Sequence, residues 1–383
     1  MSYLVLGAGM QGKAIAYDLV KFTTGVVILA DITSTRNACQ EISFALDNTR
    51  ILQGSIDATS PTFASDLLDI ATNFKIKTCI SAIPYEFNLK VTEACIAAKI
   101  NLVDLGGNNN TVKEQYKLDL QAKNRGVTIL PDCGLMPGLG NILAAGLIND
   151  PTRTPKSVKI LCGGLPENPK PPLDYKLAFN IKGLTNEYFD DAIVLRNGEI
   201  ITIPGFSELE EVQIDGKTFE AFVTSGGVST APVNFQRRIS DYQYKTLRYP
   251  GHHQKLQLIR DLGLLSTDPE DFFQGRTKVS VSPRDMFHKV VPKKISFPED
   301  TDIVYLQASC TYTNGETAIQ TLIDRQDRYF TAMARTTGFT TAIVAQMIES
   351  EGLPPGVHAL ELVIDANKLS KKLALRGIKI QDS

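Results

Sequence analysis

Three glycines near the start of the chain have the spacing of a phosphate-binding turn. Gly7, Gly9 and Gly12 form the pattern G-x-G-x-x-G between a short apolar run and a stretch of helical periodicity. In such a turn the first glycine permits the tight bend, the second lets the backbone approach a pyrophosphate, and the third lets the helix pack against the strand. The free N–H groups at the start of the helix, at Met10 and Gln11, would then face the phosphates. Taken alone, the pattern also fits a tight strand-to-helix turn with no ligand.

An acidic residue at the end of the next apolar run favours the nucleotide interpretation. Asp31 ends the run "VVILAD", 22 residues after Gly9. A carboxylate at this position accepts hydrogen bonds from the adenosine ribose hydroxyls and repels a 2′-phosphate. The sequence therefore predicts NAD rather than NADP as the cofactor, although Arg36 could partly tolerate the phosphate. Asp57, after the third apolar run, is a candidate contact on the adenine side, and it equally fits a surface turn.

The fourth apolar run ends in small residues followed by a proline. Ala82, Ile83 and Pro84 form this ending, within "SAIPYEF". Such a turn would let the backbone lie against the ribose and nicotinamide of the cofactor. A plain loop at the end of a strand is the alternative.

These candidate residues depend on an alternation of strands and helices over the first 130 residues. Strands are expected at 3–8, 26–32, 50–57, 77–83, 101–107 and 127–132, and helices at 11–21, 65–74, 89–98 and 112–124. Short apolar runs between amphipathic helices are typical of a parallel sheet covered on both faces. We therefore predict an α/β fold with a doubly wound Rossmann domain over residues 1–134. Its ligand would bind at the carboxyl ends of the strands.

The second half of the chain has a different pattern. Prolines and glycines in 151–172 predict a crossing between domains. Hairpins are expected at Asn197-Gly198 and Asn314-Gly315, each of which separates two apolar runs. This indicates a second domain on a mainly antiparallel sheet over residues 135–330. Residues 331–383, with a helix at 341–351, are expected to return to the Rossmann domain.

Composition gives no reason to expect nucleic acid or a membrane as a partner. The 383 residues carry a formal net charge of −2, with 43% hydrophobic and 21% charged residues. No apolar stretch approaches the roughly 20 residues that span a bilayer, and the first strand begins too early to leave room for a signal peptide. The six cysteines and four histidines show no metal-type spacing. We expect a cytoplasmic protein without a metal.

Five motifs in order along the chain resemble the saccharopine dehydrogenase and reductase family. They are "PDCGLMPGLGNIL", "KPPLDYKLAF", "EAFVTSGGVST", "YKTLRYPGHHQKLQLIRDLGLL" and "RTTGFTTAIVAQMI". Within that family they are most similar to the lysine 6-dehydrogenases. The resemblance implies that residues 135–330 form an α/β domain for substrate binding and dimerisation. It also implies a homodimer that oxidatively deaminates the ε-amino group of L-lysine with NAD. The products would be ammonia and a semialdehyde that closes to piperideine-6-carboxylate. Saccharopine or carboxynorspermidine dehydrogenase is the alternative activity, and a nucleotide-binding regulatory protein is the alternative of another class.

That chemistry needs a group to take a proton from the amine, because a cation cannot release hydride. Asp104, at the end of "NLVD", is the first candidate, with a helix cap or turn as its alternative role. His252 in "YPGHH" is a second, since histidine exchanges protons near neutral pH. His252 and the adjacent His253 could also be surface residues. Asp132 and Cys133, in "PDCG", are expected to line the cleft.

The α-carboxylate of an amino acid calls for a guanidinium, which binds carboxylates through two parallel hydrogen bonds. Arg248 is the first choice for this role and Lys245 the second. The remaining candidates for the substrate site are Tyr175, Thr224, Ser225, Gly226 and Tyr249, with Glu187 and Tyr188 as weaker ones. The "TSGG" segment also fits a strand-ending turn.

Overall fold

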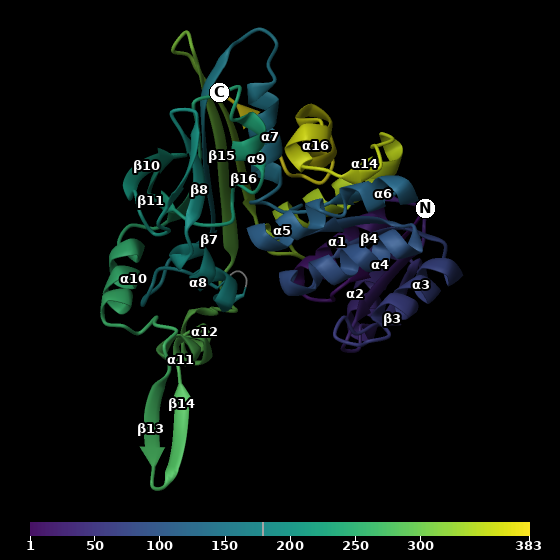
Figure 1. Ribbon diagram of the computed structural model, residues 1–383, viewed down its shortest axis with the longest axis horizontal. Helices are drawn as coiled ribbons and strands as arrows, with labels where there is room; N and C mark the ends of the chain where they lie inside the picture. The colour runs from purple at the N-terminus through teal and green to yellow at the C-terminus, as the bar shows by residue number, and fades with distance from the viewer. Residues whose placement is uncertain (178–179) are drawn as a thin grey trace.

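The N-terminal part of the chain forms a parallel sheet with helices on both faces (Figure 1). The computed structural model describes residues 1–177 and 180–383, so Ala178 and Phe179, at the end of "KPPLDYKLAF", lie outside the described residues. The elements of this part are β1 (Ser2–Leu6), α1 (Met10–Phe22), β2 (Val27–Asp31), α2 (Arg36–Leu46), β3 (Ile51–Ser55), α3 (Phe63–Asn73), β4 (Ile76–Ser81), η1 (Tyr85–Phe87), α4 (Asn88–Ala98), β5 (Asn101–Asp104), α5 (Asn109–Tyr116), α6 (Asp119–Arg125) and β6 (Thr128–Leu130).

Within the described residues this sheet has seven strands in the order β17-β6-β5-β4-β1-β2-β3. All its pairings are parallel. Strand β1 shows why apolar runs form it: Tyr3 and Val5 enter one hydrophobic core, whereas Leu4 and Leu6 enter the core on the opposite face. The predicted doubly wound arrangement is confirmed, and the carboxyl ends of β1, β4 and β5 lie along one edge.

A second, mixed sheet follows. Its part of the chain contains α7 (Leu139–Ile148), β7 (Pro155–Pro166), α8 (Ile181–Phe189), β8 (Ala192–Arg196), β9 (Glu199–Ile203), β10 (Glu210–Ile214), β11 (Lys217–Val223), α9 (Ala231–Phe235), β12 (Asp241–Arg248), α10 (His252–Asp261), β13 (Glu270–Gln274), β14 (Thr277–Val281), α11 (Pro283–Val290), α12 (Pro292–Ile295), β15 (Asp302–Tyr312) and β16 (Thr317–Arg325). The main path of the sheet is β10-β11-β12-β7-β15-β16-β18. Of its pairings only β12 with β7 is parallel among the described strands, so the mainly antiparallel expectation is confirmed.

The prediction that 151–172 is a crossing between domains is wrong. Residues Pro155–Pro166 form β7, a central strand that pairs with both β12 and β15. The prolines that suggested a loop stand at its two ends, where no ladder hydrogen bond from them is needed. Gly163, in its interior, lies so close to β12 that an added Cβ would come within 2.7 Å of the Leu247 carbonyl oxygen.

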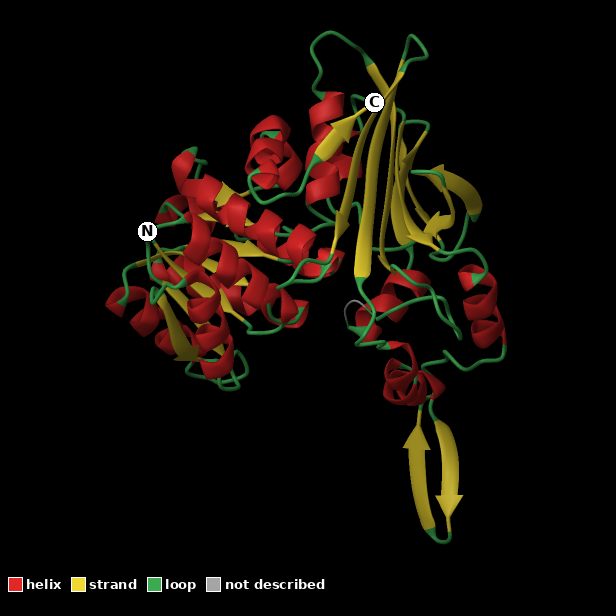
Figure 2. Ribbon diagram, turned by 180° about the vertical axis from the view of Figure 1, so that it is seen from behind, coloured by secondary structure: helices red, strands yellow, loops and turns green. Residues whose placement is uncertain are grey.

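The predicted hairpins are both present. Strands β8 and β9 meet at Asn197-Gly198, and β15 and β16 join through the turn that contains Asn314-Gly315. A further hairpin, β13–β14, extends away from the rest of the second domain (Figure 2).

The C-terminal part contacts both sheets. It consists of α13 (Ala332–Ala334), the π-helical turn η2 (Arg335–Phe339), α14 (Thr340–Ser350), β17 (Gly356–Val357), α15 (Leu360–Val363), α16 (Ala366–Ala374) and β18 (Ile380–Asp382). Helix α14 contacts α1, β4 and β5, and β17 pairs with β6, so this part returns to the Rossmann domain. Strand β18, in contrast, pairs with β16 of the second sheet. No helix among the described residues is long and apolar enough to cross a membrane.

Candidate active site

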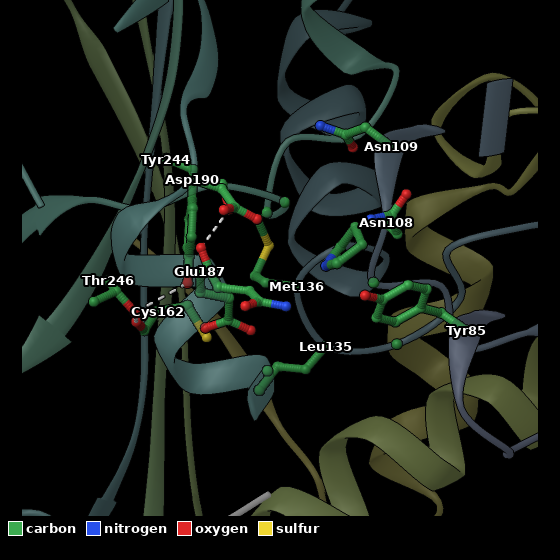
Figure 3. Close-up of a pocket in the computed structure, with 18 of the residues that line it drawn as sticks. Tyr85, Asn108, Asn109, Leu135, Met136, Cys162, Glu187, Asp190, Tyr244 and Thr246 are labelled. Carbon is green, nitrogen blue, oxygen red and sulfur yellow. Dashed lines mark hydrogen bonds between the residues drawn. The ribbon is translucent and has the colours of Figure 1, made fainter. Parts of the chain in front are cut away.

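A cavity of about 800 Å³ lies between the carboxyl edge of the parallel sheet and the second sheet (Figure 3). On the nucleotide side its wall includes Gln11, Tyr85, Leu105, Gly107, Asn108, Asn109 and Lys113. On the other side it includes Cys162, Glu187, Asp190, Asp191, Ser225, Gly226, Tyr244, Thr246 and Arg248. This is the size and position expected of a small-molecule site in an α/β protein.

Strand alternation decides which residues of β12 reach this cavity. Tyr244, Thr246 and Arg248 line it, and side chains two residues apart on a strand share one face. Lys245 points to the other face, where its Nζ donates to the Glu208 carbonyl oxygen at 2.6 Å and lies 2.8 Å from the Glu210 carboxylate. The structure thus places Arg248, the first choice for binding the carboxylate, at the cavity, and directs Lys245, the second choice, away from it.

Arg248 is held by a chain of buried hydrogen bonds behind the cavity wall. Its Nε donates to the Tyr188 hydroxyl at 2.5 Å, and its Nη1 donates to the Leu247 carbonyl at 2.7 Å. The Tyr188 hydroxyl in turn lies 3.0 Å from Nε2 of His252, whose Nδ1 donates to the Leu173 carbonyl at 2.9 Å. The Nη2 atom of Arg248 has no hydrogen-bond partner among the residues that the structure describes. The guanidinium is therefore fixed in direction while one donor group remains open to an anion.

His252 does not line the cavity. Its side chain is fully buried at the start of α10, and burial together with the Arg248 charge lowers its pKa to about 3. The imidazole is therefore neutral and accepts the Tyr188 proton in its hydrogen bond. This position makes His252 a support of Arg248 and provides no path for the proton shuttle that the sequence suggested.

Glu187, at the end of α8, shares the cavity wall with Arg248. No described residue donates a hydrogen bond to its carboxyl group, whereas its backbone carbonyl accepts the Ser225 N–H at 2.8 Å. Burial raises the pKa of this carboxyl to about 7, against the opposing effect of the Arg248 charge. A carboxyl group with a pKa near neutrality can both take up and release protons at physiological pH.

The glycine turn has the geometry that the sequence predicts. Gly7 has a φ of +96°, and an added Cβ would come within 2.6 Å of the Ala82 carbonyl oxygen. A Cβ on Gly12 would come within 1.8 Å of the Gly7 carbonyl oxygen, whereas one on Gly9 would meet no atom within 4 Å. No side chain caps the start of α1, so its first N–H groups are open toward the space beside Gly9. These residues fit a pyrophosphate.

Of the other predicted nucleotide contacts, Asp31 and Ala82 adjoin this turn. Asp31 accepts the Ala8 N–H at 2.7 Å and the Thr33 N–H and hydroxyl at 2.9 Å each. Burial acts to raise the pKa of Asp31, but these hydrogen bonds outweigh it and the pKa is lowered, so the carboxylate stays charged. Asp57 caps its own turn through the Thr59 N–H and hydroxyl at 2.7 Å each. The Ala82 N–H donates to the Leu6 carbonyl at 2.8 Å, which places the turn with Ile83 and Pro84 beside Gly7.

Comparison with known proteins agrees with this architecture. Residues 3–130 match the saccharopine dehydrogenase NADP binding domain, and residues 134–378 match the saccharopine dehydrogenase C-terminal domain. The chain belongs to the saccharopine dehydrogenase family.

Individual relatives are similar over part of their length. Saccharopine dehydrogenase [NADP(+), L-glutamate-forming] from Pyricularia oryzae is 27% identical over 238 residues, which cover 59% of this chain and 50% of that protein. Mitochondrial alpha-aminoadipic semialdehyde synthase from Bos taurus is 29% identical over 199 residues, which cover 49% of this chain and 21% of that protein. The chain thus matches half or less of the length of these relatives. The structure of apo saccharopine dehydrogenase (L-Glu forming) from Saccharomyces cerevisiae superposes with a TM-score of 0.77 over 100% of this chain and 99% of that one, at 20% identity. That likeness establishes a shared fold.

Asp104 and Cys133, two residues that the sequence predicted for the site, are buried behind the cavity wall. Asp104 is fully buried, and its oxygens accept the Gly106 N–H at 2.8 Å and the Gln115 amide at 2.7 Å. Burial raises the pKa of Asp104 to about 6, yet its side chain does not line the cavity. This matches the alternative role of a turn and cap residue. Cys133 lies in the hydrophobic core, where burial raises the pKa of its thiol well above its usual value.

Other predicted substrate contacts also lie outside the wall. Tyr175 is buried with its ring centre 4.7 Å from the Arg248 guanidinium carbon, and Tyr249 donates to the Pro166 carbonyl at 2.8 Å on the far side of the sheet. Thr224 is buried, whereas Ser225 and Gly226 do reach the cavity. The cation site and the "TSGG" segment are therefore brought together, as the sequence suggested.

Sequence reasoning missed several lining residues. Tyr244 and Thr246 could have been found from the alternation along β12 once Arg248 was assigned to the cavity. Cys162 could not, because it lies on β7, in the segment whose sequence pattern predicted a crossing between domains. Tyr85 and Asn108 follow predicted strand ends, and Lys113 lies in the helix predicted at 112–124. The sequence carries no signal that distinguishes these three from ordinary polar residues. Among the residues that the structure describes, no group of three or more His, Cys, Asp or Glu could hold a metal ion.

Proposed function

We propose that this protein oxidises the ε-amino carbon of L-lysine with NAD. The products are ammonia and a semialdehyde that closes to piperideine-6-carboxylate. The observation that carries the proposal is the pairing of Arg248, with an open Nη2, and Glu187, with an unbonded carboxyl group, on one cavity wall opposite the nucleotide domain.

The nucleotide supplies the hydride acceptor when it is bound. Gly9 and the open start of α1 would hold its pyrophosphate, and Gln11, which reaches both the turn and the cavity, lies between that site and the substrate. Asp31 favours NAD, because a charged carboxylate at the ribose repels a 2′-phosphate. The matched domain and the fungal relative both carry NADP in their names, so a preference for NAD would distinguish this chain from them.

Arg248 would bind the α-carboxylate of the substrate. The Tyr188–His252 support fixes its guanidinium plane, so little conformational entropy is lost when the anion binds. Charge-assisted hydrogen bonds of this kind contribute roughly 1.5–3 kcal/mol each.

Glu187 would take the proton that the ε-ammonium must lose. The neutral amine can then transfer hydride from its Cε, and water adds to the resulting imine before ammonia leaves. Glu187 can return the proton to the departing nitrogen, which is general acid–base catalysis by one carboxyl group near its own pKa.

The charges around the cavity favour lysine over saccharopine. Among the described residues of the wall, the cations are Arg248 and the exposed Lys113, and the acids are Glu187, Asp190 and Asp191. Saccharopine carries more carboxylates than amines, so this wall would leave some of the carboxylates of saccharopine without a cationic partner. Lysine carries the opposite excess. The acidic residues also suit carboxynorspermidine, in which amines outnumber carboxylates as they do in lysine.

Initial rates test the proposal directly. NADH or NADPH formation would be followed with lysine, saccharopine and carboxynorspermidine, and the product would be trapped with o-aminobenzaldehyde, which detects the cyclic imine. We expect turnover with lysine and NAD, and we expect the trapped product. Turnover of saccharopine without turnover of lysine would refute the proposal.

A further inference from the structure

Asp132 lies outside the lining of the cavity, in hydrogen-bond contact with both domains. It follows β6 and is 4% exposed. One carboxylate oxygen, Oδ1, accepts the Gly107 N–H at 3.2 Å, and the other, Oδ2, accepts the Ser229 hydroxyl. The two oxygens of one side chain therefore reach two segments that are far apart in the sequence.

Each of these segments forms part of the cavity wall. Gly107 lines it on the nucleotide side, next to Asn108. Ser229 follows Ser225, Gly226 and Gly227, which line it on the side of the second domain. The carboxylate is thus a short link between the wall of the nucleotide domain and the wall of the second domain.

We propose that Asp132 is a positioning residue that fixes the separation of these two walls, and with it the distance from Arg248 to the nucleotide side. The effect on turnover rests on the proposed function, whereas the link between the walls does not. Asp132 would act through this link, and not through the direct contact with substrate that the sequence suggested.

The local backbone shows that this placement is demanding. Asp132 and Ser229 have φ values of +60° and +48°, in the left-handed region that non-glycine residues rarely adopt. Gly106 approaches so closely that an added Cβ would lie 1.7 Å from Oδ1 of Asp132. Burial also raises the pKa of Asp132 to about 7, with the Asp104 charge adding to this effect and the Ser229 hydrogen bond opposing it. A carboxyl group that only capped its own turn would need neither the hydrogen bond from Ser229 nor the close approach of Gly106.

Glu361 offers a matched comparison. This buried carboxyl on α15 accepts the Thr230 hydroxyl at 2.6 Å and the Asn234 amide at 2.8 Å. It therefore holds the segment that follows Ser229 but has no hydrogen bond to the nucleotide wall. Loss of its charge should affect one wall, whereas loss of the Asp132 charge should affect both.

Hydrogen–deuterium exchange of the full-length protein tests the link. Peptides from 103–112 and 222–232 would be compared in wild type, Asp132→Asn and Glu361→Gln, with the β8–β9 hairpin as an internal reference. We expect faster exchange in both segments for Asp132→Asn and in 222–232 alone for Glu361→Gln. Kinetically, Asp132→Asn should raise KM for lysine about tenfold through the lost charge-assisted bonds, with a smaller change in NADH affinity.

The outcomes separate the two proposals. If wild type does not turn over lysine, the proposed function fails and the exchange data still decide the role of Asp132. Wild-type exchange in Asp132→Asn, or faster exchange in only one of the two segments, would overturn the link. If Asp132→Asn does not fold, Ser229→Ala removes only the cross-wall bond. It should speed exchange in 222–232 and produce the same rise in KM, and wild-type values for both would equally overturn the link.

Discussion

Replacement of Glu187 by glutamine should make the protein more stable and less active at the same time. The substitution keeps the shape of the side chain and removes its ability to ionise. In the folded protein, burial raises the pKa of Glu187 to about 7 from an ordinary value of 4.5. The charged carboxylate is therefore disfavoured in the folded state relative to the unfolded one.

The size of the effect follows from this shift. Each pKa unit corresponds to about 1.4 kcal/mol, so a shift from 4.5 to about 7 corresponds to about 3 kcal/mol at most. The sign follows from proton binding: between these two pKa values the folded state binds more protons than the unfolded state, so wild-type stability falls as pH rises through this window. Above about pH 7 the full penalty applies, and below about pH 4.5 it is absent.

Urea unfolding at several pH values would measure the effect. The stability of Glu187→Gln relative to wild type should increase from pH 5 to pH 8.5 by up to about 3 kcal/mol. In the same pH series, kcat/KM of Glu187→Gln for lysine should be lower than that of wild type by roughly a hundredfold or more, which is the usual contribution of a general base. The inflection of the wild-type kcat/KM profile near pH 7, which reports the titration of Glu187, should be absent from the profile of the variant.

A matched control is Glu199→Gln, which changes the same side chain at an exposed position on β9. It should alter neither stability nor rate. If the stability difference between Glu187→Gln and wild type does not change with pH, the carboxyl is not perturbed by burial. If activity also survives, Glu187 is not the base.

Three further substitutions test the cofactor and substrate sites. Asp31→Ser should narrow the preference for NAD over NADP in kcat/KM, and equal use of both cofactors by wild type would contradict the assignment. Gly9→Val should abolish NADH binding in a fluorescence titration while the fold survives, because a Cβ at Gly9 meets no atom within 4 Å; unchanged affinity would place the nucleotide elsewhere. Arg248→Lys keeps the charge but loses the planar fork, so KM for lysine should rise about ten- to a hundredfold while KM for NAD stays level, for a loss of roughly 1.5–3 kcal/mol. A wild-type KM for every substrate would remove Arg248 from the site.

The sequence by itself determined the nucleotide domain. The glycine spacing, the acid at Asp31 and the alternation of apolar runs with amphipathic helices depend on local geometry, which a short segment encodes in full. The hairpins at Asn197-Gly198 and Asn314-Gly315 were readable for the same reason. The choice of Arg248 as a cavity residue came from its chemical type together with the family motif.

Only the tertiary structure decided which polar residues face the cavity. Asp104 and His252 have suitable chemistry, but packing from both sides buries them. Glu187 was a weak candidate because nothing in its local sequence reports the burial that shifts its pKa. Strand β7 was misjudged because its Gly163 is explained by the close approach of β12, a neighbour about 80 residues away. Burial and non-local contact depend on the whole fold, and for this reason the walls of the site, unlike the glycine turn, could not be read from any single stretch of the chain.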